Sequence, residues 1–421
     1  MSKILLKGGR VMDPESKRDE VTDILVVDQD IAKIGSIESD NEMNVVDASG
    51  LLVIPGIIDL HVHLRDFEQA AKETIESGTK AARKGGVTTV FTMPNTKPVL
   101  CTKEAILKYR ELFKNARIHV EIIGAITKDE AGRELADIDD YPALGIKFIS
   151  DDGFDVNDEA LLEEAYKKAK EHDLILVTHP EMNSIGIGGV LNEGEVSRKL
   201  GLPGQPNEKE WKAVERGIRL ALKTGARAHF THISTKESVE LVRQAKKESE
   251  FITCDATPHH FSLTETEALR VGTLAKVNPP LRTEEDRQAL IAAIKDGTVS
   301  FIITDHAPHT ETDKGDDFMK AAFGISQIET SLAASITELH FKQGIPLMRV
   351  IELMTLAPSR FVNLRVGRLK EGYPADITLV DLNTEKVVDR MAFVSKGKNT
   401  PFHGKVLKGW PVKTLVQGSI Y

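Results

Sequence analysis

The sequence has few cysteines, no long apolar run and no excess of basic charge. Its two cysteines, Cys101 and Cys254, can form at most one disulfide, so the chain does not resemble a disulfide-rich secreted protein. No stretch approaches the roughly 20 apolar residues of a transmembrane helix, and the first residues lack the apolar core of a signal peptide. A net charge of -9, with both signs mixed along the chain, argues against nucleic acid or a membrane as the main partner. We therefore expect an ordinary cytoplasmic protein.

The length and the rhythm of the middle region indicate an α/β barrel. An α/β barrel takes about 250 residues as one domain, so 421 residues fit one barrel and a smaller domain. From about residue 53 to 360, strand-like runs alternate with amphipathic helical patterns. The runs are "VIPGIIDLHVHL", "GVTTVFTMP", "HVEIIGAIT", "LGIKFISDDG", "LILVTHPE", "AHFTHIST", "FITCDATPHH" and "FIITDHAPH". Eight such units predict a (β/α)8 TIM barrel.

Both ends of the chain differ from the middle. Short strand-like pieces with glycine and aspartate turns occur in "KILLKGGRVMD" and "VTDILVVDQDIAKIG", and again in "VGRLKEGYPADITLVDL" and "GKVLKGWPVKTLVQGSIY". We predict a small β-sandwich domain formed by both termini. The expected parts are residues 1–54 and 363–421 for that domain and residues 55–362 for the barrel.

Polar residues in the middle region recur at one place in each unit, where a predicted strand ends. These residues are His61, His63, Asn95, Asp151, Asp152, His179, His232, His259, His260, Asp305, His306 and His309. The C-terminal ends of the strands are where barrel enzymes place their active sites. Histidines elsewhere, at 119, 172, 229, 340 and 403, are expected to be structural.

Imidazoles combined with carboxylates suggest a metal centre. His61 and His63 share side-chain parity along one strand, so the pair can hold one ion from a single strand end. Such ligands suit Zn²⁺, Mn²⁺ or Co²⁺, with zinc as the default. The candidates are numerous enough for two ions that share a water molecule of lowered pKa.

Several motifs resemble those of one family. "PGIIDLHVHLRD" is similar to the cyclic amidohydrolases, and "MPNTKPV", "FISDDG", "TPHHFSL", "VNPPLR" and "TDHAPHT" together closely resemble bacterial class I dihydroorotases. "SKGKNTPFHGKVLKGWPV" is similar to the closing strands of that family. The resemblance covers essentially the whole chain.

The resemblance implies roles for individual residues. The implied ligands of two Zn²⁺ ions are His61, His63 and Asp305 for the first, His179 and His232 for the second, and Asp151 as the bridge. The implied substrate-binding residues are Arg65, Asn95, Asn278 and His309. Relatives such as hydantoinases use a carboxylated lysine as the bridge, and Lys147 is the alternative here. We prefer Asp151 because "SDDG" matches the class I pattern.

The implied reaction is the reversible cyclisation of N-carbamoyl-L-aspartate to L-dihydroorotate in pyrimidine biosynthesis. A hydroxide that bridges the metals attacks the ring amide, and Asp305 acts as general base and then acid. Three stretches beside the motifs depart from the family pattern, namely "DFEQ" after Arg65, "HPEM" at His179 and "AAFGIS" after the last strand. These departures concern loop shape and substrate affinity.

Two alternatives remain open at this point. One is another cyclic amidohydrolase, a hydantoinase or allantoinase, although Arg65 with Asn95 favours a substrate that has a carboxylate. The other is a non-catalytic scaffold for aspartate transcarbamoylase. The sequence also leaves open whether the chain forms a homodimer, whether it binds a transcarbamoylase, and which metal it holds.

Overall fold

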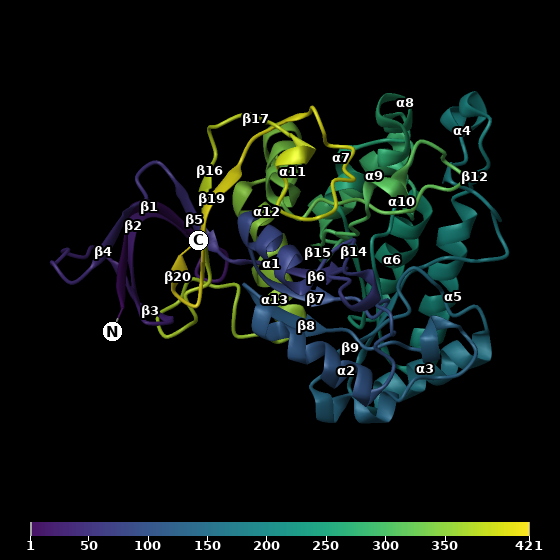
Figure 1. The fold of residues 1–421 in the computed structure, drawn as a ribbon. Helices are drawn as coiled ribbons and strands as arrows, with labels where there is room; N and C mark the ends of the chain where they lie inside the picture. Colours follow the sequence, from purple (N-terminus) through teal and green to yellow (C-terminus); the bar gives the residue numbers. More distant parts are fainter. Residues whose placement is uncertain (1, 421) are drawn as a thin grey trace.

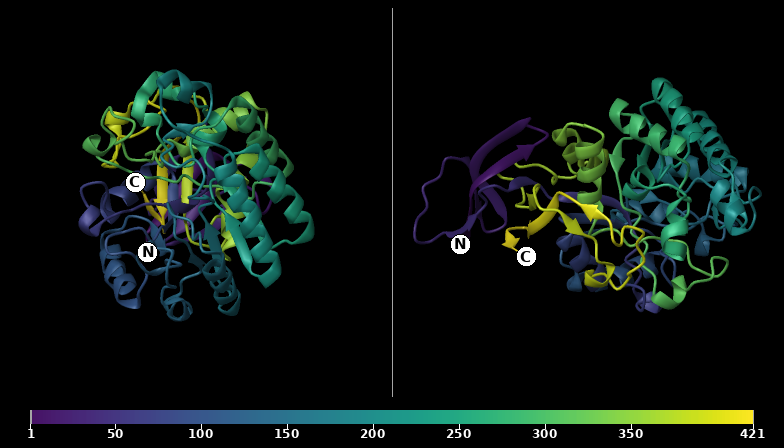
Figure 2. Two further views of the ribbon diagram at one scale, coloured as in Figure 1. Left: turned by 90° about the vertical axis from the view of Figure 1, so that its right-hand side faces the viewer. Right: turned by 90° about the horizontal axis from the view of Figure 1, so that it is seen from above.

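The computed structural model describes residues 2–420, and it divides into a barrel and a β domain (Figure 1). The barrel forms the right side of Figure 1 and the β domain the left side, where both chain ends lie. Two further views in Figure 2 show helices around the barrel and the β domain projecting from one side of it. Among residues 2–420, no helix is long and apolar enough to cross a bilayer.

Eight parallel strands form the barrel, as the sequence predicts. They are β6 (Ile57–Val62), β7 (Val87–Thr92), β8 (His119–Ile122), β9 (Phe148–Ile149), β10 (Ile175–Thr178), β13 (Arg227–Phe230), β14 (Ile252–Ala256) and β15 (Phe301–Ile302). They pair as a three-stranded sheet, β6-β7-β8, and a five-stranded sheet, β15-β14-β13-β10-β9. Parallel bridges between Gly124 and Ile149 and between Val62 and His306 join the two sheets at both edges. These bridges close the TIM barrel.

Helices follow seven of the eight barrel strands. The helices are α1 (Ile75–Lys84), α2 (Lys103–Arg110), α3 (Glu159–Glu171), α5 (Glu208–Thr224), α6 (Lys236–Glu248), α9 (Glu284–Asp296), and the group α11 (Ser331–Ser335), α12 (Leu347–Met354) and α13 (Leu356–Phe361). Side-chain caps define where they begin, since Thr74, Thr235 and Thr283 each accept a hydrogen bond from a backbone N–H of the first turn. Three short 3₁₀ turns replace the helix after β8, at Lys128–Glu130, Ile138–Asp140 and Pro142–Leu144.

The interior of the barrel is packed with side chains. Alternate residues of the strands point inward and form one buried cluster, which includes Ile58, Leu60, Phe91, Phe148, Val177 and Phe301. The barrel is therefore a solid core, and a ligand can enter only beyond the strand ends.

The β domain combines strands from both ends of the chain. Its strands are β1 (Lys3–Asp13), β2 (Arg18–Val27), β3 (Asp30–Gly35), β4 (Asn44–Asp47), β5 (Leu52–Pro55), β16 (Ile377–Asp381), β19 (Trp410–Val416) and β20 (Ser419–Ile420). They pair as one continuous sheet in the order β20-β19-β16-β5-β1-β2-β3, with β4 beside β1, around an apolar core of its own. We keep 54 and 362 as proposed domain boundaries, because β5 continues into β6 and α13 ends at Phe361.

A partly buried polar joint connects the β domain to the barrel. His119, at the start of β8, lies 3.0 Å from Asp376, just before β16, measured from Nε2 to Oδ2. Thr378 donates from Oγ1 to the carbonyl of Gly86 at 2.7 Å. Both contacts lie near the N-terminal ends of barrel strands, so the β domain leaves the opposite end of the barrel free for a site.

We predict that the His119–Asp376 pair makes stability depend on pH. Burial lowers the pKa of His119, but the hydrogen bond to Asp376 and the charges of Asp376 and Glu121 together outweigh burial and raise the pKa above its ordinary 6.5. The stabilisation is therefore fully present below about pH 6.5 and is lost as the pH rises through the raised value. We expect His119→Gln to lower the free energy of unfolding by about 1–2 kcal/mol at pH 5.5 and by less at pH 8.5, measured by urea denaturation.

The matched control for this prediction is His403→Gln. His403 is exposed and forms no ion pair within residues 2–420. An equal loss at both pH values for His119→Gln would contradict a charged pair at the joint.

Candidate active site

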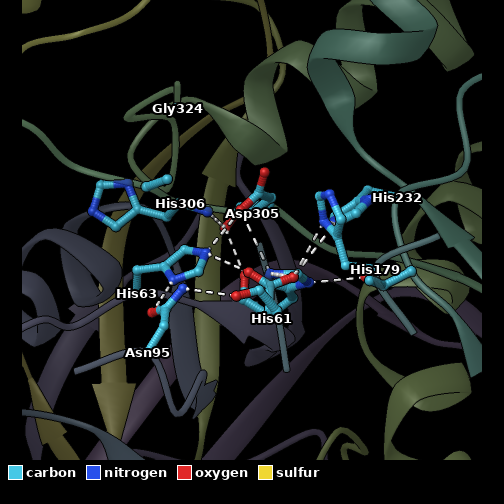
Figure 3. A network of polar contacts seen from close by, with 12 residues as sticks. His61, His63, Asn95, His179, His232, Asp305, His306 and Gly324 are labelled. Atoms are coloured by element: carbon cyan, nitrogen blue, oxygen red, sulfur yellow. Dashed lines mark hydrogen bonds and ion pairs between the residues drawn. The ribbon is translucent and has the colours of Figure 1, made fainter. Parts of the chain in front are cut away.

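Six side chains with metal-binding groups gather at the C-terminal ends of the barrel strands. Figure 3 shows the four histidines and Asp305 lying around one centre. The six are His61, His63, Asp152, His179, His232 and Asp305. None is more than 5% exposed. Five of these were expected ligands, and the structure brings all five together.

Asp152 lies at the middle of this cluster. Its Oδ1 is 3.3 Å from Nε2 of His61, and its Oδ2 is 3.3 Å from Nε2 of His63. Oδ1 also lies 3.7 Å from Nδ1 of His179 and 3.5 Å from Nε2 of His232. Two groups of three potential ligands therefore share this one carboxylate, and within each group the ligand atoms lie within 4.8 Å of one another.

Strained backbone conformations occur at several of these positions. His232 has φ 39° and Asp305 has φ 49°, and the three residues from Arg65 to Phe67 also have positive φ. Residues other than glycine rarely adopt such values, and the surrounding structure must compensate for the strain. The positive φ values change the direction of the side chains at the positions where the strands end.

The residues present fit a divalent metal centre. Nε2 of His61 and Oδ1 of Asp152 are buried, and neither forms a hydrogen bond. Buried polar atoms without partners are costly, and here they belong to imidazole and carboxylate groups that face one another. Imidazole nitrogen and carboxylate oxygen are the ligands that zinc and similar ions use in catalytic sites.

The charges of the cluster shift the pKa values of its members. Burial lowers the pKa of His61, but the nearby carboxylates of Asp152, Asp305 and Asp255 together outweigh burial and raise it to about 9. Burial also lowers the pKa of His179, but its close contacts with the carboxylates of Asp152 and Glu181 together outweigh burial and raise it to about 10. Burial raises the pKa of Asp305, but the hydrogen bond from His63 and the charges of His61 and His63 together outweigh burial and lower it. The buried carboxylates thus need nearby positive charge, which ring protons or a metal cation can supply.

The structure differs from the sequence-based choice of Asp151 as the bridge. Oδ1 of Asp151 accepts hydrogen bonds from the backbone N–H of Ile126 at 2.7 Å and of Thr127 at 2.9 Å, and Oδ2 accepts one from Thr127 Oγ1. Burial raises the pKa of Asp151 to about 6. Adjacent side chains leave an extended chain in opposite directions, so only one of the two aspartates can face the histidines. That residue is Asp152, and the choice of Asp151 is corrected accordingly.

Lys147, the alternative bridge, lies at the other end of its strand. It directly precedes β9, and its Nζ donates a hydrogen bond to the carbonyl of Val362 at 2.8 Å. It lines a separate cavity with Asp173 and Arg227, near the N-terminal ends of the strands. A carboxylated Lys147 could not reach the histidine cluster.

Arg65 provides a buried positive charge in the wall of the cavity. It is 8% exposed and forms no ion pair within residues 2–420, and its Nε has no hydrogen-bond partner. Its terminal nitrogens lie 3.5 Å from Oδ1 of Asn95 and 3.5 Å from Nε2 of His309. A buried guanidinium without a carboxylate partner among the described residues favours an anionic ligand.

His309 and Asn95 are held in fixed orientations beside Arg65. Burial, with the charges of Arg65 and Lys72, lowers the pKa of His309 to about 2, so its ring is neutral. Asn95 Oδ1 lies 2.9 Å from Nδ1 of His63, and its Nδ2 donates to the carbonyl of Asp152 at 3.2 Å. Asn95 therefore links the histidine cluster to the arginine.

Asn278 lines the opposite side of the same cavity. Its Nδ2 donates to Oε2 of Glu181 at 2.5 Å and lies 3.1 Å from Nε2 of His179. Glu181 also lies 3.0 Å from that ring nitrogen and pairs with Lys209. Sequence analysis did not single out Glu181, although its place two residues after His179 in "HPE" gave it the same side-chain parity.

Two further residues that sequence analysis missed orient His61. Nδ1 of His61 lies 2.8 Å from Oγ1 of Thr231, which in turn donates to Asp255. Asp255 also accepts a hydrogen bond from the backbone N–H of His232. Such outer partners fix the ring orientation of metal-binding histidines. No periodicity in the sequence reveals them, because their role depends on contacts between separate strands.

Most of the candidate residues line one cavity of about 150 Å³, and the exceptions are His61 and His309. Its walls combine the histidine cluster, Arg65 with Asn95, and a loop after β15 that contributes Phe323 and Gly324. Figure 3 shows Gly324 on the same side of the centre as His306. The loop that departs from the family pattern in sequence therefore lines the cavity.

Comparison with known proteins identifies the family of the chain. The Amidohydrolase family profile matches residues 52–421. The chain is 44% identical to a dihydroorotase of Clostridioides difficile over 418 residues, covering 99% of each chain. It is 42% identical to a dihydroorotase of Elusimicrobium minutum, covering 99% of this chain and 97% of that protein.

A solved structure with a similar fold is the L-hydantoinase (dihydropyrimidinase) from Arthrobacter aurescens. The TM-score is 0.88 at 26% identity, and the match covers 100% of this chain and 96% of that one. The chain therefore belongs to the amidohydrolase family, and the two relatives at 42% and 44% identity over nearly its whole length are dihydroorotases.

Proposed function

We propose that this protein is a dihydroorotase, which interconverts N-carbamoyl-L-aspartate and L-dihydroorotate in pyrimidine biosynthesis. The observation that carries the proposal is the buried, unpaired Arg65 in the same cavity as the cluster of histidines and aspartates. Dihydroorotate has a cyclic amide to be opened and a carboxylate to be bound, and this cavity offers a group for each. Relatives named dihydroorotase at 41–44% identity over 99% of the chain support the same reaction.

The metal-binding part of the proposal involves six residues. His61, His63 and Asp305 would hold one Zn²⁺, His179 and His232 a second, and Asp152 would bridge the two. When bound, such ions supply Lewis-acid catalysis, because they polarise a carbonyl oxygen and lower the pKa of water. The two ions, and zinc as their identity, are part of the proposal.

Asp305 is the residue we assign to proton transfer. It is buried beside the cavity, with Oδ1 3.0 Å from Nε2 of His63 and 3.5 Å from Nε2 of His61. In the hydrolytic direction, water adds to the ring amide carbon and the C–N bond breaks. Asp305 accepts the proton that the water loses and delivers it to the leaving nitrogen, as a general base and then a general acid.

Arg65, Asn95 and His309 orient the substrate through its carboxylate. A planar guanidinium can donate two parallel hydrogen bonds to one carboxylate, and the neutral His309 can add a third donor. This contact fixes the ring relative to Asp305 and the metal ligands. Asn278 completes the opposite wall, where its amide also contacts Glu181.

Two alternatives receive less support. A hydantoinase shares the fold, but hydantoin has no carboxylate that would require Arg65. A non-catalytic scaffold for aspartate transcarbamoylase would not need all six ligand residues. We also propose a cytoplasmic location. We propose no protein partner, neither a second copy of the chain nor a transcarbamoylase.

The assignment of the bridge can be tested at two adjacent residues. We expect Asp152→Ala to lose metal and to lower turnover of dihydroorotate by more than about 100-fold, because both groups of ligands share that carboxylate. Asp151→Ala is the matched control, and it should keep about two metal ions per chain while it lowers the melting temperature. Metal content is measured by inductively coupled plasma mass spectrometry. Loss of metal from Asp151→Ala alone would restore the first aspartate as the bridge.

The role of Arg65 can be tested with a pair of substrates. L-Dihydroorotate and 5,6-dihydrouracil share a ring and differ in the carboxylate. Arg65→Lys should lower kcat/KM for dihydroorotate by about 10–100-fold, because lysine cannot form the paired hydrogen bonds. The same substitution should have little effect on kcat/KM for dihydrouracil, which has no carboxylate. Arg219→Lys, on the exposed face of α5, is the control. A wild-type preference for dihydrouracil would favour a dihydropyrimidinase instead.

Asp305→Asn separates metal binding from proton transfer. The amide can stay beside the metal but cannot accept a proton, so we expect a loss of about 10²–10⁴ in turnover that persists at full metal occupancy. Both turnover and bound zinc are measured on the same protein sample. If added zinc returned the variant to near wild-type turnover, Asp305 would be a ligand only.

A further inference from the structure

A segment near the C-terminus returns to the active-site end of the barrel. After β16, the chain leaves the β domain and crosses to α7 (Pro258–Ser262) and α11, where Figure 1 shows it in yellow. Phe402 and Leu407 pack there against Leu263 and Ala333. This segment carries "SKGKNT", residues 395–400, which none of the roles assigned above explains.

Asn399 of this segment is buried and its side chain is fully hydrogen-bonded. It is 1% exposed. Its Nδ2 donates to the carbonyls of Ala307 and Gly324, each at 3.0 Å. Its Oδ1 accepts one hydrogen bond from the backbone N–H of His309 at 3.0 Å and another from Oγ of Ser326 at 2.8 Å. A primary amide offers two donors and two acceptor positions, so all four are used.

These four partners belong to two loop stretches after β15, one with Ala307 and His309 and the other with Gly324 and Ser326. His309 contacts Arg65 and is one of the three residues proposed to bind the substrate carboxylate, and Gly324 lines the cavity. Neither stretch forms a regular strand, and one isolated bridge joins them, between His306 and Ile325, where the N–H of Ala307 donates to the carbonyl of Ile325 at 2.9 Å. The side chain of Asn399 adds four hydrogen bonds to this single bridge, two to each stretch.

Close packing of the segment supports a specific role for it. A Cβ added at Gly397 would lie 2.4 Å from Oγ of Ser326 and 2.5 Å from Cβ of Pro308, which precedes His309. The segment thus approaches this loop more closely than any residue with a side chain would allow.

The same segment also contacts the loop that carries Arg65. Oγ of Ser395 donates to Glu73, which is 0% exposed, and the backbone N–H of Lys396 donates to Glu73 at 3.3 Å. The carbonyl of Glu73 accepts a hydrogen bond from the N–H of Asp66, the neighbour of Arg65. Residues 395–400 therefore contact both loops that approach the substrate carboxylate.

We propose that Asn399 is a positioning residue for the carboxylate subsite: it holds the backbone of His309 and Gly324 at the correct distance from Arg65. This inference rests on the proposed function, since it assumes a carboxylate substrate. Asn399 itself does not face the cavity, so it acts through His309 and not on the reacting atoms. Loss of Asn399 should weaken substrate binding and leave the metal ligands in place.

The test compares Asn399→Ala with Asn383→Ala, a matched control at an exposed asparagine of the same C-terminal region. We expect Asn399→Ala to raise KM for dihydroorotate about tenfold, with kcat within about threefold of wild type and unchanged zinc content. A residue that only stabilises the fold would lower the melting temperature and the active fraction but would leave KM unchanged. An unchanged KM, or an equal loss in kcat, would overturn the inference.

A milder variant covers the case in which Asn399→Ala does not fold. Ser326→Ala removes only the hydrogen bond from Ser326 Oγ to Asn399, and should raise KM about threefold at constant zinc content. An unchanged KM in this variant would then overturn the inference. If the wild-type protein with full metal content does not turn over dihydroorotate, the proposed function itself fails. If the wild-type protein is active but the substitutions at Asn399 and Ser326 leave KM unchanged, only the inference about Asn399 fails.

Discussion

Two backbone hydrogen bonds join the first and last strands of the barrel, and the active site depends on them. The N–H of Asp305 donates to the carbonyl of His61, and the N–H of His63 donates to the carbonyl of His306. These bonds bring together residues more than 240 positions apart and place Asp305 beside the H-x-H pair. Asp59 strengthens the same seam inside the barrel, because its carboxylate accepts hydrogen bonds from the N–H and Oγ1 of Thr304. Barrel closure thus produces the ligand geometry directly.

The charges that gather beyond this seam explain the layout of the cavity. Buried carboxylates at Asp152 and Asp305 require positive partners, and four histidines surround them. The guanidinium of Arg65 lies within the same cavity but outside contact distance of either carboxylate, so it remains available to an anionic ligand. Asn95 separates the two regions by contacts to both His63 and Arg65. The cavity therefore has one part suited to a metal-activated amide and another suited to a carboxylate.

The β domain and the C-terminal segment support the barrel at opposite ends. The β domain joins the N-terminal ends of the strands through polar contacts such as His119 with Asp376. The segment of residues 395–400 then passes to the other end, where Asn399 connects the two stretches that carry His309 and Gly324. A chain that returns from the β domain to the active-site loops gives those loops a rigid support that their own irregular backbone does not provide.

The sequence by itself determined the alternation of eight strands with helices, the β-rich ends, and the strand ends that carry histidine and aspartate. It did so because hydrophobic periodicity and strand-end position are local properties, and because parallel strands of a barrel place their C-terminal ends at one rim. Only the tertiary structure decided which of Asp151 and Asp152 faces the histidines, since that choice depends on hydrogen bonds from Ile126 and Thr127, about 25 residues earlier in the chain. The same holds for Glu181, Thr231 and Asp255, whose partners lie on other loops and strands, and for Asn399, whose side-chain hydrogen bonds reach across 73–92 residues. Contacts of that span follow from packing, which no local pattern of residues encodes.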